Sequence, residues 1–536
     1  MKRKPVLLAL GAILAIALAA PVTADEALPP IAKVEIRPNR AIGVNGEPFF
    51  PLMAWLQGPA NFSLIKSCGM NSTAGFSGRT PAAQNVKQYL DLAEKAGLYG
   101  VMPFNESLKG HPALLGYIHG DEPDLPREVS DADVVPASDL RINPKNPLWK
   151  LVDGDSSSWT VLDPLEGAAV TIKRKEPVTV ESLAVWFTIS DGLSTAKEIA
   201  FEGDGKEILR ATVEAKRGRQ KFALSKPAAF RELTIKVLSS VPGANLWGSV
   251  GEIEGFDKEG TNVLLSKPRP VPRAMPAETL RRYEAIKAAD SSRPVFMTLT
   301  GYFHPIFKKW GDEPRKMYPD YVKATDVVGY DIYPIYGWNK PEWIYLVNEA
   351  TDMLVKMAGQ RPVYAWIETS KGSQWTGPLE GQKDVTPAHI RAEVWMAICR
   401  GATAIGYFTH IWKPSYQQFG VPPENRETLK QINAQITRLA PAILGDEPKR
   451  AVAIQSEDGV KLDALARQKA NDLYIFTVNY DERMKATRAT IKVEGLPAGT
   501  DVVVVDENRT IPSGAGAFAD SFEPLAVHMY RMSMAR

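Results

Sequence analysis

Two carboxylate side chains stand next to each other at the end of an apolar run. Residues 113–123 read A-L-L-G-Y-I-H-G-D-E-P, so the run ends in Asp121 and Glu122. A buried strand of a parallel barrel ends in this way when it presents catalytic side chains at the barrel mouth. The same letters also fit a strand that ends in a solvated Asp-Glu turn. A partner carboxylate elsewhere in the chain is needed to decide between the two.

Glu368 is the best partner, because it follows another apolar run in P-V-Y-A-W-I-E-T-S. Cleavage of a glycosidic bond requires a proton donor and either a nucleophile or a base, and two facing carboxyls supply both. Burial and mutual repulsion would raise the pKa of one carboxyl and leave the other ionised. The alternative for Glu368 is an ion pair with a lysine of the barrel.

The elements that must position these carboxyls alternate between short apolar strands and helices, which predicts β/α units on a parallel sheet. Eight such units form a (β/α)8 TIM barrel, an α/β fold whose active residues lie at the carboxyl ends of the strands. The fourth strand should end near Glu122 and the seventh near Glu368, so we expect the two to face each other. The expected strands are residues 49–56, 71–76, 98–104, 114–120, 294–299, 327–332, 362–367 and 404–408.

Two stretches of the chain lack this alternation. Short β-type runs over residues 138–262 predict a β-sandwich (jelly roll) inserted after the fourth strand. A second β-rich region, 447–536, predicts a C-terminal β-sandwich. The catalytic barrel is then formed by residues 42–137 and 263–446.

Side chains at the other strand ends, and aromatic residues near them, could bind a sugar, because flat rings pack on sugar faces and polar groups bind hydroxyls. Tyr333 and Trp412 could instead be packing residues. The letters Gly-Asp-Glu-Pro occur again at 311–314, but no apolar run enters them. The candidate substrate-binding residues are Asp121, Trp55, Asn105, His119, Tyr302, His304, Asp331, Trp366, Trp375, His410 and Trp412.

The first residues of the chain predict export. Lys2, Arg3 and Lys4 precede an apolar run, and a small-residue pattern ends at Ala24, which is typical of a signal peptide over residues 1–24. We therefore expect a periplasmic or extracellular protein that leaves the membrane after cleavage; an uncleaved anchor is the alternative. The formal net charge of +2 lacks the strong basic excess of nucleic-acid binders, so we expect no nucleic-acid partner.

Metal and cofactor chemistry find little support in the sequence, and we expect neither. His119, His304 and His410, together with Asp121, could form a mononuclear hydrolase site, but the chain has no H-x-H or H-E-x-x-H spacing. It also has no phosphate-binding loop and no G-x-S-x-G turn. Cys68 and Cys399 are expected to be free thiols, with a disulfide between them as the alternative.

Five segments resemble the clan A glycoside hydrolases, which are retaining enzymes on a (β/α)8 barrel. The resemblance implies that Glu122 is the acid/base, Glu368 the nucleophile, Tyr333 the residue that orients Glu368, and Trp412 a sugar platform. Asp121 departs from the pattern, because the clan commonly has Asn there; its charge would raise the pKa of Glu122. The segments are N-G-E-P-F-F-P-L, L-L-G-Y-I-H-G-D-E-P, V-V-G-Y-D-I-Y-P, P-V-Y-A-W-I-E-T-S and G-A-T-A-I-G-Y-F.

A second resemblance concerns the insert, in which L-V-D-G-D and N-L-W-G-S-V-G-E-I-E-G-F are similar to the discoidin, or coagulation-factor type C, jelly roll. It implies a β-sandwich that either binds carbohydrate or serves as a lid or spacer.

Taken together, the sequence predicts an exported retaining glycoside hydrolase that cleaves a β-linked oligo- or polysaccharide by double displacement. The main alternative is a noncatalytic glycan-binding or scaffold protein, and a weaker one is a metal-dependent hydrolase.

Overall fold

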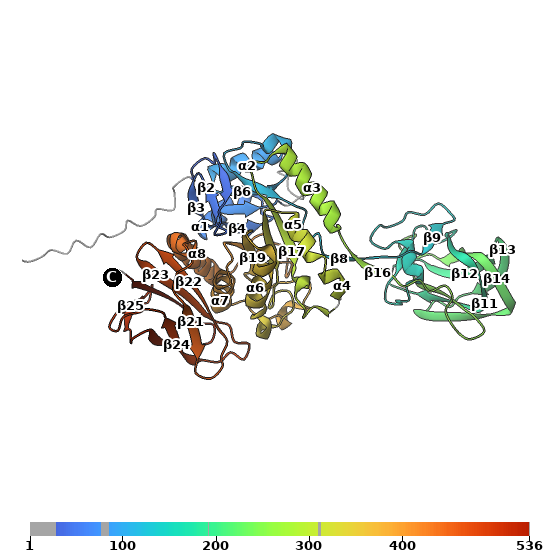
Figure 1. Ribbon diagram of the computed structural model, residues 1–536. Coiled ribbons are helices and arrows are strands. Elements are labelled where there is room, and N and C mark those ends of the chain that lie inside the picture. Colours follow the sequence, from blue (N-terminus) through green and yellow to red (C-terminus); the bar gives the residue numbers. More distant parts are fainter. Residues whose placement is uncertain (1–27, 77–84, 191, 309–311, 535–536) are drawn as a thin grey trace, which may run out of the picture. The chain divides into compact units, whose positions relative to one another are not determined.

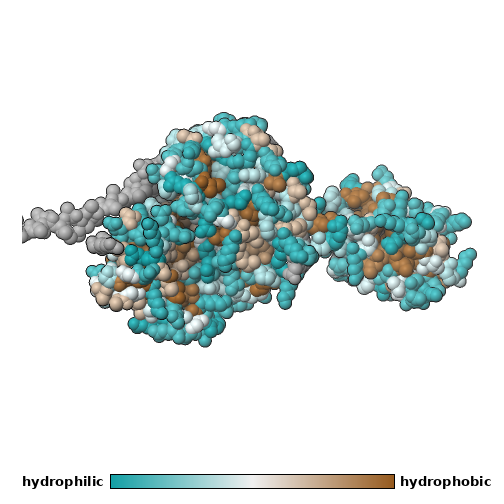
Figure 2. All heavy atoms as spheres, in the orientation of Figure 1, coloured by the Kyte–Doolittle hydropathy of each residue, from teal (hydrophilic) through white to brown (hydrophobic). Residues whose placement is uncertain are grey.

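The computed structural model describes residues 28–76, 85–190, 192–308 and 312–534. The chain divides into two compact units, one formed by Met1–Leu125 and Arg273–Arg536 and the other by Pro126–Pro272 (Figure 1). Hydrophilic residues cover most of the visible face of each unit (Figure 2). The predicted signal peptide, 1–24, lies outside the described residues. Within the described ranges, no helix has the length and apolar character needed to cross a membrane.

Eight parallel strands close into a barrel in the first unit, and β17 completes the ring by pairing with β7 (Figure 1). The predicted (β/α)8 barrel, interrupted after its fourth strand, is therefore confirmed. The barrel strands are β4 (Leu52–Trp55), β5 (Ser72–Ala74), β6 (Tyr99–Pro103), β7 (Leu114–Ile118), β17 (Val295–Thr300), β18 (Val327–Asp331), β19 (Val363–Glu368) and β20 (Ala404–Phe408).

Helices connect the barrel strands, and the way they are buried differs: α7 is buried all round from Ala392 to Cys399, whereas other helices bury one face. In α2, for example, Tyr89, Leu90 and Ala93 are buried, which is the spacing of a single helical face. Cys68 and Cys399 are both free and buried. The helices are α1 (Phe62–Ser67), α2 (Val86–Lys95), α3 (Pro276–Ala289), α4 (Asp312–Arg315), α5 (Tyr318–Lys323), α6 (Leu346–Ala358), α7 (Pro387–Cys399) and α8 (Pro423–Ile443).

The barrel interior is filled by large rings that lie over glycines of the neighbouring strand. The ring of Tyr364 covers Gly329, and the ring of Trp366 covers Gly406, so closely that a Cβ atom on either glycine would overlap the ring. Both side chains also hydrogen-bond Thr298: the Trp366 Nε1–H donates to its Oγ1 at 3.0 Å, and the Tyr364 hydroxyl lies 2.9 Å from it. Because barrel interiors are closely packed, each large ring requires a small neighbour.

The C-terminal region of the first unit is a β-sandwich, as predicted. Its sheets have the strand orders β21-β24-β27 and β22-β23-β28-β25-β26. The ring of Phe476 from the larger sheet stacks on Trp395 of α7, with centroids 5.5 Å apart. The strands are β21 (Val452–Ser456), β22 (Leu462–Lys469), β23 (Asp472–Asn479), β24 (Thr487–Val493), β25 (Asp501–Val504), β26 (Arg509–Pro512), β27 (Ala517–Phe522) and β28 (Val527–Ser533). A small antiparallel sheet precedes the barrel: β1 (Val34–Ile36), β2 (Ile42–Val44) and β3 (Glu47–Phe49).

The second unit is the predicted inserted β-sandwich. Its main sheet has the order β10-β15-β11-β14-β12-β13, and register shifts in β11 and β14 let these long strands bend around one apolar core. Strands β8 and β16, at the two ends of the insert, pair with each other. The strands are β8 (Pro126–Val129), β9 (Asp133–Pro136), β10 (Thr160–Leu162), β11 (Ala169–Phe187), β12 (Thr195–Gly203), β13 (Lys206–Thr212), β14 (Gly218–Val241), β15 (Gly248–Phe256) and β16 (Arg269–Pro272).

The ring-over-glycine packing predicts a strong dependence on Gly406. Gly406→Ala should destabilise the protein by about 1–3 kcal/mol, because the new methyl group overlaps the Trp366 ring. Gly381→Ala is the matched control, since a Cβ there has open space and no positive φ. Chemical unfolding of the two variants measures the difference, and equal stabilities would contradict the role of this packing.

Candidate active site

The carboxyl ends of the barrel strands carry the side chains that the sequence singled out. Because all eight strands are parallel, these ends share one rim of the barrel. Glu122 follows β7, Asp331 ends β18, Glu368 ends β19, and His410 follows β20. The rim therefore collects carboxyls from three strands.

The loop after β7 holds Glu122 in an uncommon conformation. Its φ of +47° lies in the left-handed region, which residues with a side chain rarely adopt and which is enriched at functional sites. Arg273, on the chain that returns from the insert, stabilises this turn: its Nη1–H donates to the carbonyl oxygen of Asp121 at 3.1 Å and lies 3.5 Å from Glu122 Oε2. Both the backbone conformation of Glu122 and the guanidinium group of Arg273 therefore fix the position of the Glu122 side chain.

Asp124 anchors the same loop to the barrel. It is fully buried and accepts hydrogen bonds from the Thr300 N–H at 3.0 Å and from the Tyr318 hydroxyl at 2.8 Å. Burial raises the pKa of Asp124 to about 6, against the lowering effect of these hydrogen bonds. Its role is to fix the loop, because its carboxyl is used entirely within the protein.

Glu122 and Asp331 form a carboxyl pair in which each group acts on the pKa of the other. Two carboxyls can bond only if one of them is protonated. Burial, followed by the charges of Glu122 and Asp121, raises the pKa of Asp331 well above its usual range. Burial also raises the pKa of Glu122, but the hydrogen bond from Asp331 and the charge of Arg273 oppose this. The two carboxyls therefore hold one proton between them up to a higher pH than a single exposed carboxyl would.

Asp121 adds a third carboxyl to this cluster. Enclosure by protein, and then the charge of Glu122, raises the pKa of Asp121 to about 7. Asp121 is nevertheless an exposed residue, so solvent weakens this rise. From the sequence we expected Asp121 to raise the pKa of Glu122; the largest cause on Glu122 is burial.

Glu368 lies deeper than the sequence suggested, with 0% of its surface exposed. Its carboxyl accepts the backbone N–H groups of Ile335, at 2.9 Å, and of Tyr336. Burial raises its pKa to about 7, and Glu393 of α7, the helix that packs on β19, acts on this pKa as well. Glu393 was missed in the sequence; the signal was a single acid within the helical run A-E-V-W-M-A-I-C, which is otherwise apolar.

Tyr333 lies near both pairs of carboxyl groups. Burial raises its pKa well above the usual value, followed by the charges of Asp331, Asp121, Glu122 and Glu368. These charges place the hydroxyl within electrostatic range of both the Glu122 cluster and Glu368. The two backbone N–H donors to Glu368 come from the loop that begins at Tyr333.

Aromatic rings continue along the rim from Tyr333. Phe408 lies 4.8 Å from Tyr333 and stacks on Trp412 at 6.1 Å, and Trp375 lies 6.0 Å from Trp412. Trp375 is 57% exposed and Tyr416 is 42% exposed, which is unusual for such large apolar rings. The predicted residues Trp375, His410 and Trp412 thus belong to one aromatic surface that reaches solvent.

The other predicted residues have different surroundings. Trp55 and Trp366 are buried against each other at 4.8 Å and fill the barrel. Asn105 caps a short 3-10 helix by accepting the Ser107 N–H at 3.0 Å. Tyr302 faces the cluster, because the charges of Glu122, Asp124 and Asp331 raise its pKa after burial.

The histidines of the metal hypothesis each have a separate partner. His119 Nε2 bonds the carbonyl oxygen of Ala324 at 2.8 Å, His304 Nε2 lies 3.4 Å from Glu349 Oε2, and His410 Nε2 bonds the carbonyl oxygen of Trp55 at 2.9 Å. Burial lowers the pKa of all three. They therefore act as hydrogen-bonding groups of the barrel wall and do not converge with Asp121.

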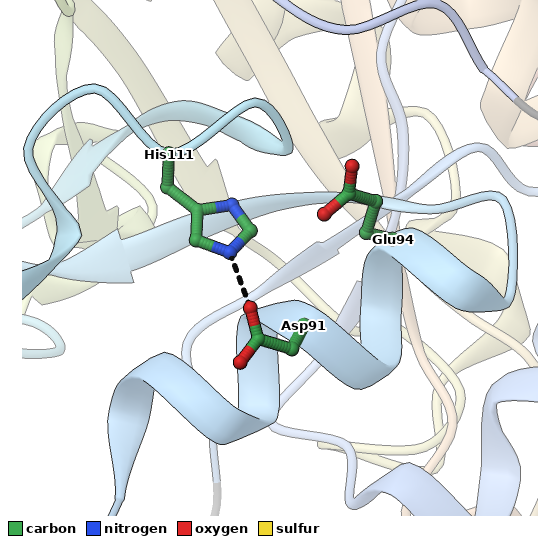
Figure 3. Close-up of side chains that lie close together, drawn as sticks. All are labelled: Asp91, Glu94 and His111. Atoms are coloured by element: carbon green, nitrogen blue, oxygen red, sulfur yellow. Dashed lines mark hydrogen bonds and ion pairs between the residues drawn. The ribbon is translucent and has the colours of Figure 1, made fainter.

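Among the described residues, one group of three potential metal ligands lies within 4.8 Å: Asp91, Glu94 and His111 (Figure 3). His111 Nδ1 accepts the Ala113 N–H at 3.1 Å, so its Nε2 carries the proton and donates to Asp91 at 2.9 Å. Neither ring nitrogen is then available as a ligand. His111 precedes β7, at the opposite end of the strand from Glu122, so this group serves the barrel's structure.

The inserted unit contains a buried carboxyl pair of its own, Asp153 and Glu252. Glu252 is 2% exposed; its Oε1 accepts the Gly154 N–H at 3.1 Å, and its Oε2 has no partner among the described residues. Burial raises the pKa of Glu252 to about 8, and the neighbouring Asp153 adds to the rise. Two carboxyls this close to each other repel when both are ionised, so the pair is a local electrostatic strain in the sandwich.

The chain was compared with known proteins. No protein-family model and no curated protein matches it. Solved structures that it resembles include the family 32 CBM from C. perfringens NanJ in complex with galactose, at 13% identity over 24% of this chain and 97% of that chain, with a TM-score of 0.20. They also include alpha-amylase from Geobacillus thermoleovorans in complex with acarbose, at 13% identity over 48% of this chain and 57% of that chain, with a TM-score of 0.34. The alpha-amylase from Anoxybacillus has a TM-score of 0.34 at 10% identity, over 49% of this chain and 57% of that chain.

The buried Glu252 predicts how stability depends on pH. A carboxyl whose pKa rises on folding ionises at a lower pH in the unfolded state than in the folded state. With a chelator present, the free energy of unfolding should therefore fall as the pH rises from about 4.5 to about 8. Glu252→Gln should flatten this fall and raise stability near pH 8 by about 1–3 kcal/mol, because the amide carries no charge to bury. Thermal unfolding across pH measures it, with the exposed Glu259→Gln as control. A fall that is unchanged in Glu252→Gln would contradict the prediction.

Proposed function

We propose that this chain is a glycoside hydrolase that cleaves O-glycosyl bonds of an oligo- or polysaccharide at the rim of its barrel. The observation that carries the proposal is that Glu122, Asp331 and Glu368 stand at the carboxyl ends of barrel strands, on a rim that also exposes aromatic rings. The pKa of both Glu122 and Asp331 is raised. A carboxyl that keeps its proton near neutral pH can protonate the leaving oxygen of a glycosidic bond. Exposed rings offer the flat faces on which sugars pack.

The proposed reaction has two displacements. A carboxylate oxygen of Glu368 attacks the anomeric carbon, the bond from that carbon to the leaving oxygen breaks, and Glu122 gives the leaving oxygen the proton that it shares with Asp331. Glu122 then takes a proton from water, whose oxygen displaces Glu368, and this restores the shared proton and the free carboxylate of Glu368. Two inversions retain the configuration of a β-linked substrate, which NMR of the first product anomer can establish.

The burial of Glu368 favours a second candidate. Glu368 has no exposed surface, so a sugar can contact it only after the groups that bury it move. If these groups stay in place, the rim binds a glycan without turning it over, and the chain is a noncatalytic glycan-binding protein. Product analysis of the purified protein on a polysaccharide panel separates the two candidates.

We also propose that the protein acts after export, in the periplasm or outside the cell. The support is the predicted signal peptide at residues 1–24. Fractionation of cells that make the full chain, with N-terminal sequencing of the mature protein, tests this.

Glu122→Gln should lower kcat/KM by about 10²- to 10⁴-fold, because the amide cannot protonate the leaving oxygen. On a substrate with an activated leaving group the loss should be smaller. Since the pKa of Glu122 is raised, the wild-type activity should fall on the alkaline side only above the ordinary range of a carboxyl, and this alkaline limb should vanish in the variant. Asp121 and Asp331 titrate together with Glu122, and the charge of Arg273 opposes the rise in the pKa of Glu122.

The chain offers a matched control in Glu313→Gln. Glu313 stands in a second Gly-Asp-Glu-Pro but is exposed on α4. The Glu313→Gln variant should retain full activity and the pH profile of the wild type. Full activity of Glu122→Gln, or equal losses in both variants, would refute the assignment of Glu122.

Trp375→Ala should raise KM about three- to tenfold with little change in kcat, because an exposed ring supplies binding energy away from the bond that breaks. Trp375→Phe should recover most of the affinity, since it keeps an aromatic face. Stability should change little, because the ring is mostly exposed. An unchanged KM on every substrate that the protein cleaves would remove Trp375 from the sugar site.

A further inference from the structure

Glu393 is a buried acid without any donor of its own. It lies on α7 with 0% of its surface exposed, and neither carboxyl oxygen receives a hydrogen bond from an N–H or O–H group of the described residues. Its helix neighbours Ala392 and Val394 are buried and apolar. A lone carboxyl in such a place destabilises the fold, so its presence calls for a partner that uses it.

That partner is Glu368. Glu393 lies on α7, which packs on β19, the strand that ends in Glu368, and each carboxyl acts on the pKa of the other. Since carboxylate oxygens only accept, a hydrogen bond between them requires that one of the two carries a proton. Glu368 already accepts two backbone N–H groups, from Ile335 and Tyr336, which favour its ionised form. Glu393 has no such donor. The proton therefore belongs to Glu393, which donates to Glu368.

We propose that Glu393 is a positioning residue that holds a proton against Glu368 and thereby fixes the orientation and the charge of this carboxylate. The inference rests on the proposed function, in which Glu368 is the nucleophile. Glu393 acts only through Glu368, because it comes from the helix behind the strand. With three donors around it, Glu368 keeps one orientation and remains ionised although it is buried.

The electrostatic surroundings support this division of roles. Burial raises the pKa of Glu393 well above its usual range and that of Glu368 to about 7, so Glu368 is the first of the pair to ionise. The titratable groups that face the pair are Tyr330 of β18, on the side of Glu393, and Tyr333 and Tyr336, on the side of Glu368. All three are neutral near pH 7. Among the described residues, no charged group of α6, α8 or the C-terminal sheet acts on either carboxyl.

Two variants of Glu393 test the proposal through the pH profile of kcat/KM. Glu393→Leu removes the donor and leaves Glu368 less stable as an anion, so the acid limb should move upward by about one pH unit and kcat should fall about 10- to 100-fold. Glu393→Gln keeps an N–H donor of nearly the same shape and should restore most of both. If both variants change only the unfolding temperature, with the acid limb in place, Glu393 is a structural residue and the proposal is wrong.

A second measurement does not depend on activity. The infrared difference spectrum between the wild type and Glu393→Gln near neutral pH should show the loss of a protonated carboxyl band. Loss of a carboxylate band instead would overturn the proposal, even if Glu393→Leu fails to fold. If the wild type cleaves no glycan while the protonated band is present, the proposed function fails and the proton assignment of Glu393 stands.

Discussion

A hydrogen bond between two carboxyl groups exists only while a proton lies between them, and the rim of this barrel depends on two such bonds. One joins Glu122 to Asp331 and the other joins Glu368 to Glu393. Glu368 and Glu393 are fully buried, and Glu122 and Asp331 are partly buried; without those protons the two carboxylates of each pair would repel each other in surroundings that screen charge poorly. The surroundings also act on each pair: Arg273 opposes the rise in the pKa of Glu122, and two backbone N–H groups favour the anion on Glu368.

The barrel provides the rigid frame in which these bonds can form. Rings of Tyr364 and Trp366 fill its interior over glycines of the adjacent strands, and Thr298 binds both rings. Asp124 fixes the loop after β7 to Thr300 of β17 and to Tyr318 of α5, so Glu122 stays close to Asp331. A displacement of one strand would separate carboxyls that must share a proton. The packing of the core therefore fixes the geometry of the site.

The barrel, the inserted sandwich and the C-terminal sandwich followed from the sequence, because strand and helix periodicities are local signals. The strand ends were also readable, so Glu122, Asp331 and Glu368 could be placed on one rim. The sequence did not show how deeply each side chain is buried or which carboxyls form pairs. Glu368 is buried because the loop after Tyr333 turns its N–H groups toward it, and Trp55 and Trp366 face the interior rather than the mouth. Glu393 was missed because its function depends on how α7 packs behind β19, a contact that no spacing in the sequence reveals.

The loop after β18 links the aromatic wall to Glu368. Its backbone at Ile335 and Tyr336 donates to Glu368, while its Tyr333 and Tyr336 rings pack on Phe408, at 4.8 and 5.2 Å. Tyr336 also touches Trp375, the exposed ring, at 5.8 Å. The same loop thus contacts the exposed aromatic ring through one side chain and donates to Glu368 through its backbone. Because the two backbone donors favour the ionised form of Glu368, the position of this loop and the charge of that carboxyl depend on each other.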